Sequence, residues 1–470
     1  MRGAVNGLSV AAGLLMLTAG VPIQSARSHT MAQRRSLATV GLYTAPPQEG
    51  QAHFLDFYKA CGYNYLEFCE TGFAIRPDLL PRYYADMSAA VRMAQEKGFR
   101  VWILLLAAMK QWKGPDRSGD AGTFSALDRA LLQERLAYLR NAVRGLKHAD
   151  GFAFFAGDPG GDREGRATIW DCMAFAREVR EIVAQEAPQA GFAVNLWAVA
   201  EWAGFPSPFT VDFWQKQVLL SRQVAYEPGF LGPECGVVFS MDNYYRSLTL
   251  RCYSDNALEP ERFPTARDIS ALRRRGVRPI YGWPYFLVDE VDDGFVTPNN
   301  VATGGQSQAE TRYIRAIADH GLKLGLDGLI ANGFYVYSEP LNIYAFARMC
   351  HEPELTPERA LDQFASLIAT PETSAALGQV LRFIENHSSW HYSLPPDYRL
   401  PDLPCRIPSA QDALNALKTV TPREQAGLVL PEAPAKYLQR LESRLRAIAE
   451  GRIGGPSPHM PPAPAKKGRL

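Results

Sequence analysis

Eight short apolar segments, each followed by a stretch of helical periodicity, constrain the fold of this chain more than any other feature. Each segment is apolar at nearly every position, the pattern of a parallel strand that is buried on both faces. Between them, apolar residues recur every three or four positions, as along amphipathic helices. The predicted strands are Leu37–Thr44, Tyr63–Phe68, Arg100–Ala107, Gly151–Phe155, Ala193–Ala198, Gly236–Ser240, Pro279–Trp283 and Gly328–Ala331. The predicted helices include Tyr84–Lys97, Ser125–Leu146, Asp171–Gln185, Val211–Val224, Ala266–Arg275 and Ala309–Leu322.

Strands that alternate with helices form either a closed barrel or an open doubly wound sheet. We favour the barrel because the segment after the first strand, Gly41–Pro47, lacks the glycine-rich turn of dinucleotide-binding sheets. Acidic and aromatic residues also follow several different strands, as they do when one rim of a barrel forms a site. The predicted fold is therefore a (β/α)8 TIM barrel over residues 36–352.

After residue 352 the strand pattern stops and helical periodicity continues to residue 450. Thr356 and Pro357 predict a helix N-terminus, with threonine as N-cap and proline at the first helical position. Ser307 and Glu310 predict a capping box at an earlier helix. The tail, residues 451–470, is rich in Pro, Gly and Lys and is predicted to be disordered. The predicted C-terminal helices are Leu355–Ala369, Thr373–Asn386, Ala410–Thr419 and Ala435–Glu450.

Residues 1–26 have the features of a secretory signal peptide. Arg2 supplies the positive charge, Leu8–Leu17 is the apolar core, and small residues offer cleavage near Gly20 or Ala26. The apolar run is short for a membrane span, which takes about 20 residues. We therefore expect a secreted or periplasmic protein without stable membrane insertion after cleavage, with an uncleaved anchor as the alternative.

Charge and cysteine content exclude some classes of partner. The formal net charge is +1, so no basic surface for nucleic acid is indicated. The chain has 7 cysteines, an odd number whose scattered spacing matches no metal cluster. The sequence predicts no cofactor and no metal.

The candidate site residues follow the predicted strands, because catalytic residues of a barrel lie at the carboxyl ends of its strands. They combine carboxylates with aromatic rings and amides. A glycosidase needs one carboxylic acid to protonate the leaving oxygen and a second as base or nucleophile. Aromatic faces and amides hold the apolar face and the hydroxyls of a sugar. The candidates are Glu70, Asp158, Asn195, Trp197, Glu201, Trp202, Asp242, Asn243, Tyr244, Trp283, Tyr285 and Asn332.

Three places carry a resemblance to a known superfamily: Gly157–Gly161, Asp242–Tyr245, and the passage from Asn332 to Leu361. With them, the layout of residues 36–370 resembles the barrel glycoside hydrolases of the β-hexosaminidase and α-glucuronidase type. The resemblance implies a glycosidase whose barrel is followed by a helix. Hexosaminidases carry an Asp-Glu pair after the fourth strand, and here Pro159 stands in place of the Glu. This departure argues against an N-acetyl-assisted mechanism and leaves Asp158 as the candidate acid.

The sequence thus predicts a hydrolase of an oligo- or polysaccharide. Asp158 is the predicted general acid and Asp242 the opposing carboxylate, with Glu70 or Glu201 as substitutes. Asp158 could instead belong to a plain turn and Asp242 could cap a helix. Two other functions stay open: a barrel that binds carbohydrate without cleaving it, and a lyase or isomerase that acts on a free sugar. Asn195, Asn243 and Asn332 are predicted to bind hydroxyls, and Trp197, Trp202, Tyr244, Trp283 and Tyr285 to contact the sugar rings.

Overall fold

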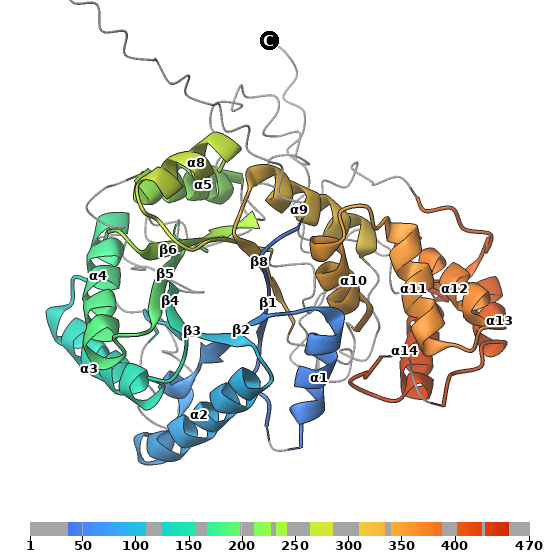
Figure 1. The fold of residues 1–470 in the computed structure, drawn as a ribbon, viewed down its shortest axis with the longest axis horizontal. Coiled ribbons are helices and arrows are strands. Elements are labelled where there is room, and N and C mark those ends of the chain that lie inside the picture. The colour runs from blue at the N-terminus through green and yellow to red at the C-terminus, as the bar shows by residue number, and fades with distance from the viewer. Residues whose placement is uncertain are drawn as a thin grey trace, which may run out of the picture. The chain divides into compact units, whose positions relative to one another are not determined.

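The computed structural model contains eight parallel strands that close into a barrel in chain order (Figure 1). The last strand pairs with the first, from Thr39 beside Gly328 to Tyr43 beside Asn332. This confirms the predicted (β/α)8 barrel. The strands are β1 (Thr39–Thr44), β2 (Tyr65–Glu70), β3 (Arg100–Leu106), β4 (Gly151–Phe155), β5 (Gly191–Asn195), β6 (Cys235–Ser240), β7 (Ile280–Trp283) and β8 (Gly328–Asn332). The structure describes residues 36–48, 50–109, 125–155, 167–197, 199, 211–226, 232–241, 264–284, 310–333, 340–387, 402–424 and 428–450.

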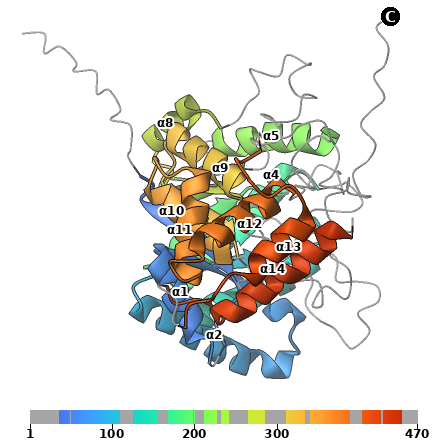
Figure 2. The ribbon, with the colours of Figure 1, turned by 90° about the vertical axis from the view of Figure 1, so that its right-hand side faces the viewer.

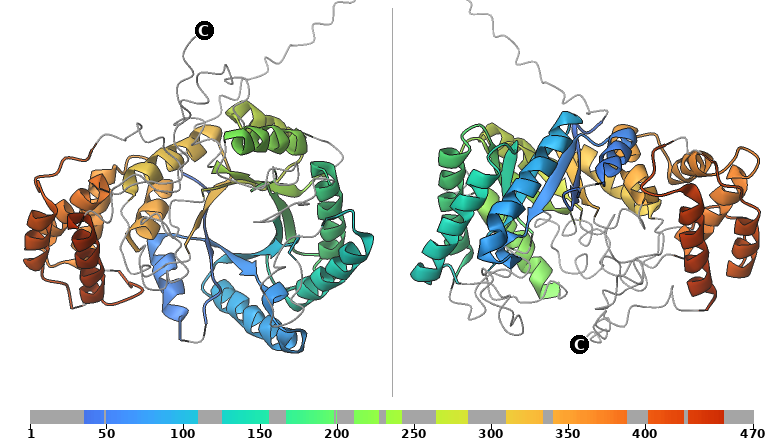
Figure 3. Two further views of the ribbon diagram at one scale, coloured as in Figure 1. Left: turned by 180° about the vertical axis from the view of Figure 1, so that it is seen from behind. Right: turned by 90° about the horizontal axis from the view of Figure 1, so that it is seen from below.

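Helices between the strands cover the outside of the barrel, as the views from behind and from below show (Figure 3). Their apolar faces cover the outward side chains of the strands. Phe154 of β4, for example, contacts Phe175 of the following helix, with ring centroids 5.4 Å apart. The strands are therefore buried on both faces, which explains why they are apolar at nearly every position. The described helices between the strands are α1 (Ala52–Cys61), α2 (Leu80–Glu96), α3 (Arg129–Gly145), α4 (Ile169–Glu186), α5 (Val211–Tyr226), α8 (Ala266–Arg274) and α9 (Thr311–Leu324), and α10 (Pro340–His351) follows β8.

Four further helices within the described residues follow the barrel and contact one another in chain order (Figure 2). The first of them begins as the sequence predicts, because the Thr356 side chain accepts the backbone N–H of Arg359 and Pro357 is the first helical residue. This helix also contacts α9 and α10 of the barrel. Among the helices that the structure describes, none is long and apolar enough to cross a membrane. The four helices are α11 (Pro357–Ile368), α12 (Ser374–Asn386), α13 (Ala410–Lys418) and α14 (Pro434–Ala449).

The start of α9 differs from the prediction. Helix α9 begins at Thr311, so Glu310 is its N-cap and not the third helical residue that a capping box with Ser307 requires. A buried carboxylate from α12 replaces the predicted box: Glu385 accepts the backbone N–H of Arg312 at 2.8 Å and the Thr311 hydroxyl at 2.5 Å. The Arg312 guanidinium also donates to Glu385 at 3.1 Å. A residue 73 positions away thus caps this helix, which no local sequence pattern could indicate.

We expect Glu385→Gln to lower the free energy of unfolding by about 2 kcal/mol, the usual value of a hydrogen bond to a charged group. The amide oxygen can still accept from the Arg312 backbone N–H and guanidinium, but the substitution places an NH2 group against the Thr311 hydroxyl and removes the charge that pairs with the guanidinium. Urea unfolding at neutral pH measures the loss. Glu354→Gln is the matched control because Glu354 is exposed, and equal stability of the two variants would contradict the capping role of Glu385.

Candidate functional site

Four aromatic rings meet inside the barrel near the carboxyl ends of the strands. Trp283, the last residue of β7, contacts Tyr43 of β1, Phe155 of β4 and Trp197 after β5, with ring centroids 5.5, 5.7 and 5.9 Å apart. Because β4 and β7 lie on different sides of the barrel, these contacts cross its interior. All four side chains are buried, and Trp283 is only 1% exposed. We refer to Tyr43, Phe155, Trp197 and Trp283 as the upper aromatic cluster.

A second group of rings fills the opposite end of the barrel. Tyr65 contacts Trp102 and Tyr281, with centroids 6.0 and 5.5 Å apart, and the Arg100 guanidinium donates to the Tyr281 hydroxyl at 2.5 Å. Gly151 is required here because a Cβ atom at this position would lie 2.3 Å from the Trp102 indole. This lower aromatic cluster (Tyr65, Trp102 and Tyr281) fills the barrel, as side chains usually do.

Glu67 lies between the two aromatic clusters. It pairs in register with Tyr43 and Trp102, so its side chain points into the barrel as theirs do. The carboxyl group is fully buried and accepts one hydrogen bond, from the Tyr65 hydroxyl at 3.4 Å. Burial raises the pKa of Glu67 to about 8, and the Tyr65 hydroxyl opposes the shift. Glu67 is therefore mainly protonated at neutral pH.

Asn195 brings a polar group to the carboxyl end of the barrel. Its Oδ1 atom accepts the backbone N–H of Trp197 at 2.9 Å, and this bond identifies the oxygen of the amide. The Nδ2 atom is buried and has no hydrogen-bond partner within the described residues. Asn195 pairs with Phe155 of β4 and Val238 of β6, so its side chain is directed inward. The structure therefore brings the predicted site residues Asn195, Trp197 and Trp283 close together, and their contact with a sugar stays a prediction.

Glu70 lies on the opposite side of β2 from this group. Its Oε1 atom accepts the Tyr138 hydroxyl of α3 at 2.6 Å and the Gly72 N–H at 2.7 Å. Burial raises the pKa of Glu70, and the Arg135 guanidinium of α3 lowers it in part. The carboxylate thus faces the outer helices and not the barrel interior. Strand alternation explains the difference, since Glu67 and Glu70 are an odd number of residues apart.

The sequence analysis did not select Glu67 as a site residue. The signal was a charged residue between two apolar residues, Leu66 and Phe68, inside a predicted strand. Trp283 was predicted to contact a sugar ring. The structure instead buries it among three other rings, as a core side chain is buried.

For Asn332 the structure gives the backbone position alone, beside Tyr43. The candidates that lie outside the described residues are Asp158, Glu201, Trp202, Asp242, Asn243, Tyr244 and Tyr285.

The described cysteines and acids form no group suited to a metal. Six cysteines are free thiols in the structure, and five of them are buried. Burial raises the pKa of the Cys69 thiol to about 12, although a hydrogen bond with Tyr43 opposes the shift, so it is not a nucleophile at neutral pH. Within the described ranges, no three His, Cys, Asp or Glu side chains are placed to hold a metal ion.

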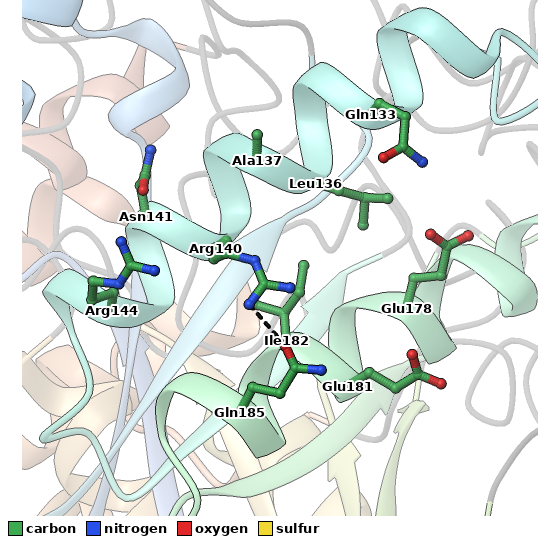
Figure 4. A pocket seen from close by; sticks show the side chains of 10 residues that line it. All are labelled: Gln133, Leu136, Ala137, Arg140, Asn141, Arg144, Glu178, Glu181, Ile182 and Gln185. Atoms are coloured by element: carbon green, nitrogen blue, oxygen red, sulfur yellow. Dashed lines mark hydrogen bonds between the residues drawn. The ribbon is translucent and has the colours of Figure 1, made fainter.

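A groove of about 390 Å³ lies on the outer surface between α3 and α4 (Figure 4). Arg140 crosses it and donates to Gln185 at 2.8 Å. Arg140 and Arg144 both also pair with Glu186, so the two guanidinium groups share one carboxylate of the protein. The groove is lined by helices outside the barrel and not by strand ends, and we assign it no role in the site.

No protein-family model and no curated protein matches this chain. Solved structures do resemble it. An O-GlcNAc hydrolase of Thermobaculum terrenum is 10% identical, with 81% of this chain and 74% of that chain covered and a TM-score of 0.45. A glycoside hydrolase family 138 enzyme, described as targeting pectin rhamnogalacturonan II, is 9% identical, with 89% and 57% covered and a TM-score of 0.49.

A third structure, a glycoside hydrolase family 30 endoxylanase of Clostridium papyrosolvens, is 14% identical, with 69% of this chain and 75% of that chain covered and a TM-score of 0.37. All three neighbours are glycoside hydrolases. At such identities the likeness concerns the fold alone, and the barrel itself is established by its strand pairing.

Proposed function

We propose that this protein is a glycoside hydrolase that cleaves O-glycosidic bonds in an oligo- or polysaccharide. The observation that carries the proposal is the position of Asn195 at the end of β5, with an amide donor that no described group accepts. In the sequence, Asp158 follows β4 and Asp242 follows β6, the two strands that flank β5. Chain segments that leave the carboxyl ends of neighbouring barrel strands meet at one rim. An amide between two carboxyl groups suits a sugar hydroxyl beside a scissile bond.

In this proposal Asp158 protonates the leaving oxygen and Asp242 acts on the opposite side of the sugar. Because β5 separates the two strands, we favour the wider carboxyl spacing of an inverting enzyme. Glu201, which follows β5 in the sequence, is the substitute for either acid. We no longer propose Glu70 as a substitute, since its carboxylate accepts from Tyr138 and Gly72 on the outer side of β2.

We expect Asp158→Asn to lower turnover of a natural glycoside by at least about 100-fold, the usual contribution of a placed proton donor. A substrate with a good leaving group needs little protonation. The same variant should therefore lose far less activity on a nitrophenyl glycoside that the wild type cleaves. A reducing-sugar screen identifies the natural substrate, and kcat/KM is then measured on both substrates.

Asp162→Asn is the matched control because Asp162 lies in the same acidic segment as Asp158; we expect its activity on both substrates to be near that of the wild type. Equal losses for Asp158→Asn on both substrates would show that Asp158 is not the acid. Binding of saccharide without any turnover by the wild type would favour the non-catalytic barrel. Conversion of a free sugar without release of a new reducing end would favour the lyase or isomerase.

A further inference from the structure

The first residues after β2 are held in place by side chains from three elements. Glu70 ends β2 and is fully buried. Its Oε1 atom accepts the Gly72 N–H at 2.7 Å and the Tyr138 hydroxyl of α3 at 2.6 Å. The preceding N–H, that of Thr71, donates to the Tyr83 hydroxyl of α2 at 2.8 Å. Side chains thus fix two consecutive backbone N–H groups at the point where the chain leaves the carboxyl end of β2.

Gly72 is packed tightly against Glu70. A Cβ atom at Gly72 would lie 2.4 Å from Glu70 Oε1 and 2.7 Å from the Tyr138 hydroxyl, well inside the optimal separation of nonbonded atoms. The contact therefore requires glycine at this position. Gly72 also begins the 3-10 helix η1 (Gly72–Ala74), the first turn of the segment that follows β2. A shift of the carboxylate would therefore shift the start of η1.

Helix α3 ties this point to the neighbouring strand. Arg135 places its guanidinium over the Tyr138 ring, 4.2 Å from the ring centroid. The same guanidinium donates to the backbone carbonyls of Leu106 and Ala107 at the end of β3, at 2.7 Å each. Because Arg135 and Tyr138 are three residues apart, they lie on one face of the helix. One face of α3 thus holds the chain both where it leaves β2 and where it leaves β3.

The contacts of Glu70 favour a supporting role over a chemical one. Its Oε1 atom binds backbone and a helix side chain, whereas a catalytic acid must come within hydrogen-bond distance of the substrate. Burial also raises the pKa of this carboxyl group, so an acid at this position is less favourable for folding than an apolar side chain. What the carboxylate supplies, and leucine could not, is a fixed acceptor for the Gly72 N–H.

We propose that Glu70 is a positioning residue of the candidate site, which acts on the substrate only through the backbone of Thr71 and Gly72. In a barrel the segments after the strands form the site, and a catalytic arrangement needs supporting contacts to keep its geometry. The proposal rests on the proposed glycosidase function, because it assigns the segment after β2 to the substrate site. The role requires an oxygen acceptor and no proton transfer, so glutamine should replace Glu70.

Three variants test the proposal through kcat/KM on the saccharide that the wild type cleaves, with circular dichroism to show that each is folded. Glu70→Ala removes the acceptor, and Gly72→Ala pushes the segment away from it. We expect each to lower kcat/KM by about 10- to 100-fold, since a misplacement of about 1 Å can cost that much. Glu70→Gln keeps the oxygen and should stay close to the wild type. If Glu70→Ala does not fold, Gly72→Ala carries the test.

Gly378→Ala is the matched control. A Cβ atom there would lie 2.7 Å from the Oδ1 atom of Asp362, so a methyl group again meets a carboxylate, but within the helices that follow the barrel. Its kcat/KM should equal that of the wild type. A loss as large as that of Gly72→Ala would show that any such clash lowers activity, and would overturn the proposal. So would Glu70→Ala as active as the wild type, or Glu70→Gln as inactive as Glu70→Ala.

Hydrogen exchange separates a failure of this proposal from a failure of the proposed function. A wild type that turns over no saccharide contradicts the function, and backbone exchange over residues 71–75, which needs no substrate, then tests the anchor alone. Exchange should be faster in Glu70→Ala than in the wild type and in Glu70→Gln. Equal exchange in all three proteins would overturn the anchor and with it the positioning role.

Discussion

Trp283→Ala is expected to lower the free energy of unfolding by about 3–5 kcal/mol, the range for removing a large aromatic side chain from a core. Trp283 is 1% exposed, and its indole contacts Tyr43, Phe155 and Trp197 across the barrel. Alanine would remove all three ring contacts and leave a cavity that rings held on separate strands cannot readily close. Urea unfolding followed by circular dichroism measures the change.

Trp170→Ala provides the control of the same residue type. Trp170 is 36% exposed near the start of α4, so we expect its loss to cost less than about 1 kcal/mol, as for most surface substitutions. A Trp283→Ala variant as stable as Trp170→Ala, but with weaker saccharide binding, would reverse our interpretation. Trp283 would then be the sugar-contacting residue that the sequence predicts.

Glu67→Gln is expected to raise the free energy of unfolding by roughly 3 kcal/mol at pH 7. The figure follows from about 1.4 kcal/mol for each pH unit by which pH 7 exceeds the pKa of Glu67 in the unfolded chain. The reason is the pKa of about 8 in the folded protein against about 4.5 for an ordinary glutamate. At pH 7 the unfolded chain gains free energy by ionising Glu67, whereas the folded protein keeps it protonated. Glutamine removes that advantage of the unfolded chain and still offers an oxygen to the Tyr65 hydroxyl.

The sign of the effect gives it a distinctive pH profile. Below about pH 4.5, Glu67 is protonated in both states and contributes no pH dependence. Between about pH 4.5 and 8 only the unfolded chain releases the proton, so the wild type loses stability as the pH rises. Above about pH 8 both states are ionised and the loss reaches its full size. The difference between Glu67→Gln and the wild type should therefore widen from pH 5 to pH 8.

Thermal or urea unfolding at several pH values between 5 and 8 measures this difference. The comparison isolates Glu67 because other buried acids with raised pKa values, Glu70 and Glu385 among them, are common to both proteins. Glu96→Gln, at an exposed position of α2, is the control for the change from glutamate to glutamine itself. A stability difference between Glu67→Gln and the wild type that stays constant with pH would mean that Glu67 ionises normally in the folded protein.

The strands could be predicted because both of their faces are buried. For β4 the predicted and observed bounds agree, Gly151–Phe155, since an uninterrupted apolar run leaves no ambiguity about its extent. Helix α10 shows the limit of the same argument. Nearly all of its residues from Pro340 to Cys350 are buried, so it lacks the polar face that produces a helical period, and the sequence analysis did not predict it.

The candidate site could be predicted only as a set of residue types near strand ends. Asn195 and Trp197 follow β5 as expected, and the structure adds the hydrogen bond between them. The acids on which the proposed reaction depends, Asp158 and Asp242, remain predictions from the sequence. The predicted capping box of Ser307 and Glu310 was wrong for a different reason. Its residue spacing was that of a capping box, but Glu385 from α12 caps the helix instead.

The sequence by itself determined the alternation of strands and helices, and with it the barrel, because hydrophobic periodicity is a local property of the chain. Only the tertiary structure decided which strand-end residues face the interior. Glu67 and Glu70 belong to one strand, but register with β1 and β3 turns Glu67 toward the aromatic clusters and leaves Glu70 among helix side chains. The same packing buries Trp283 and raises the pKa of Glu67. Burial and pKa depend on neighbours from distant parts of the chain, and these neighbours come together only when the barrel closes.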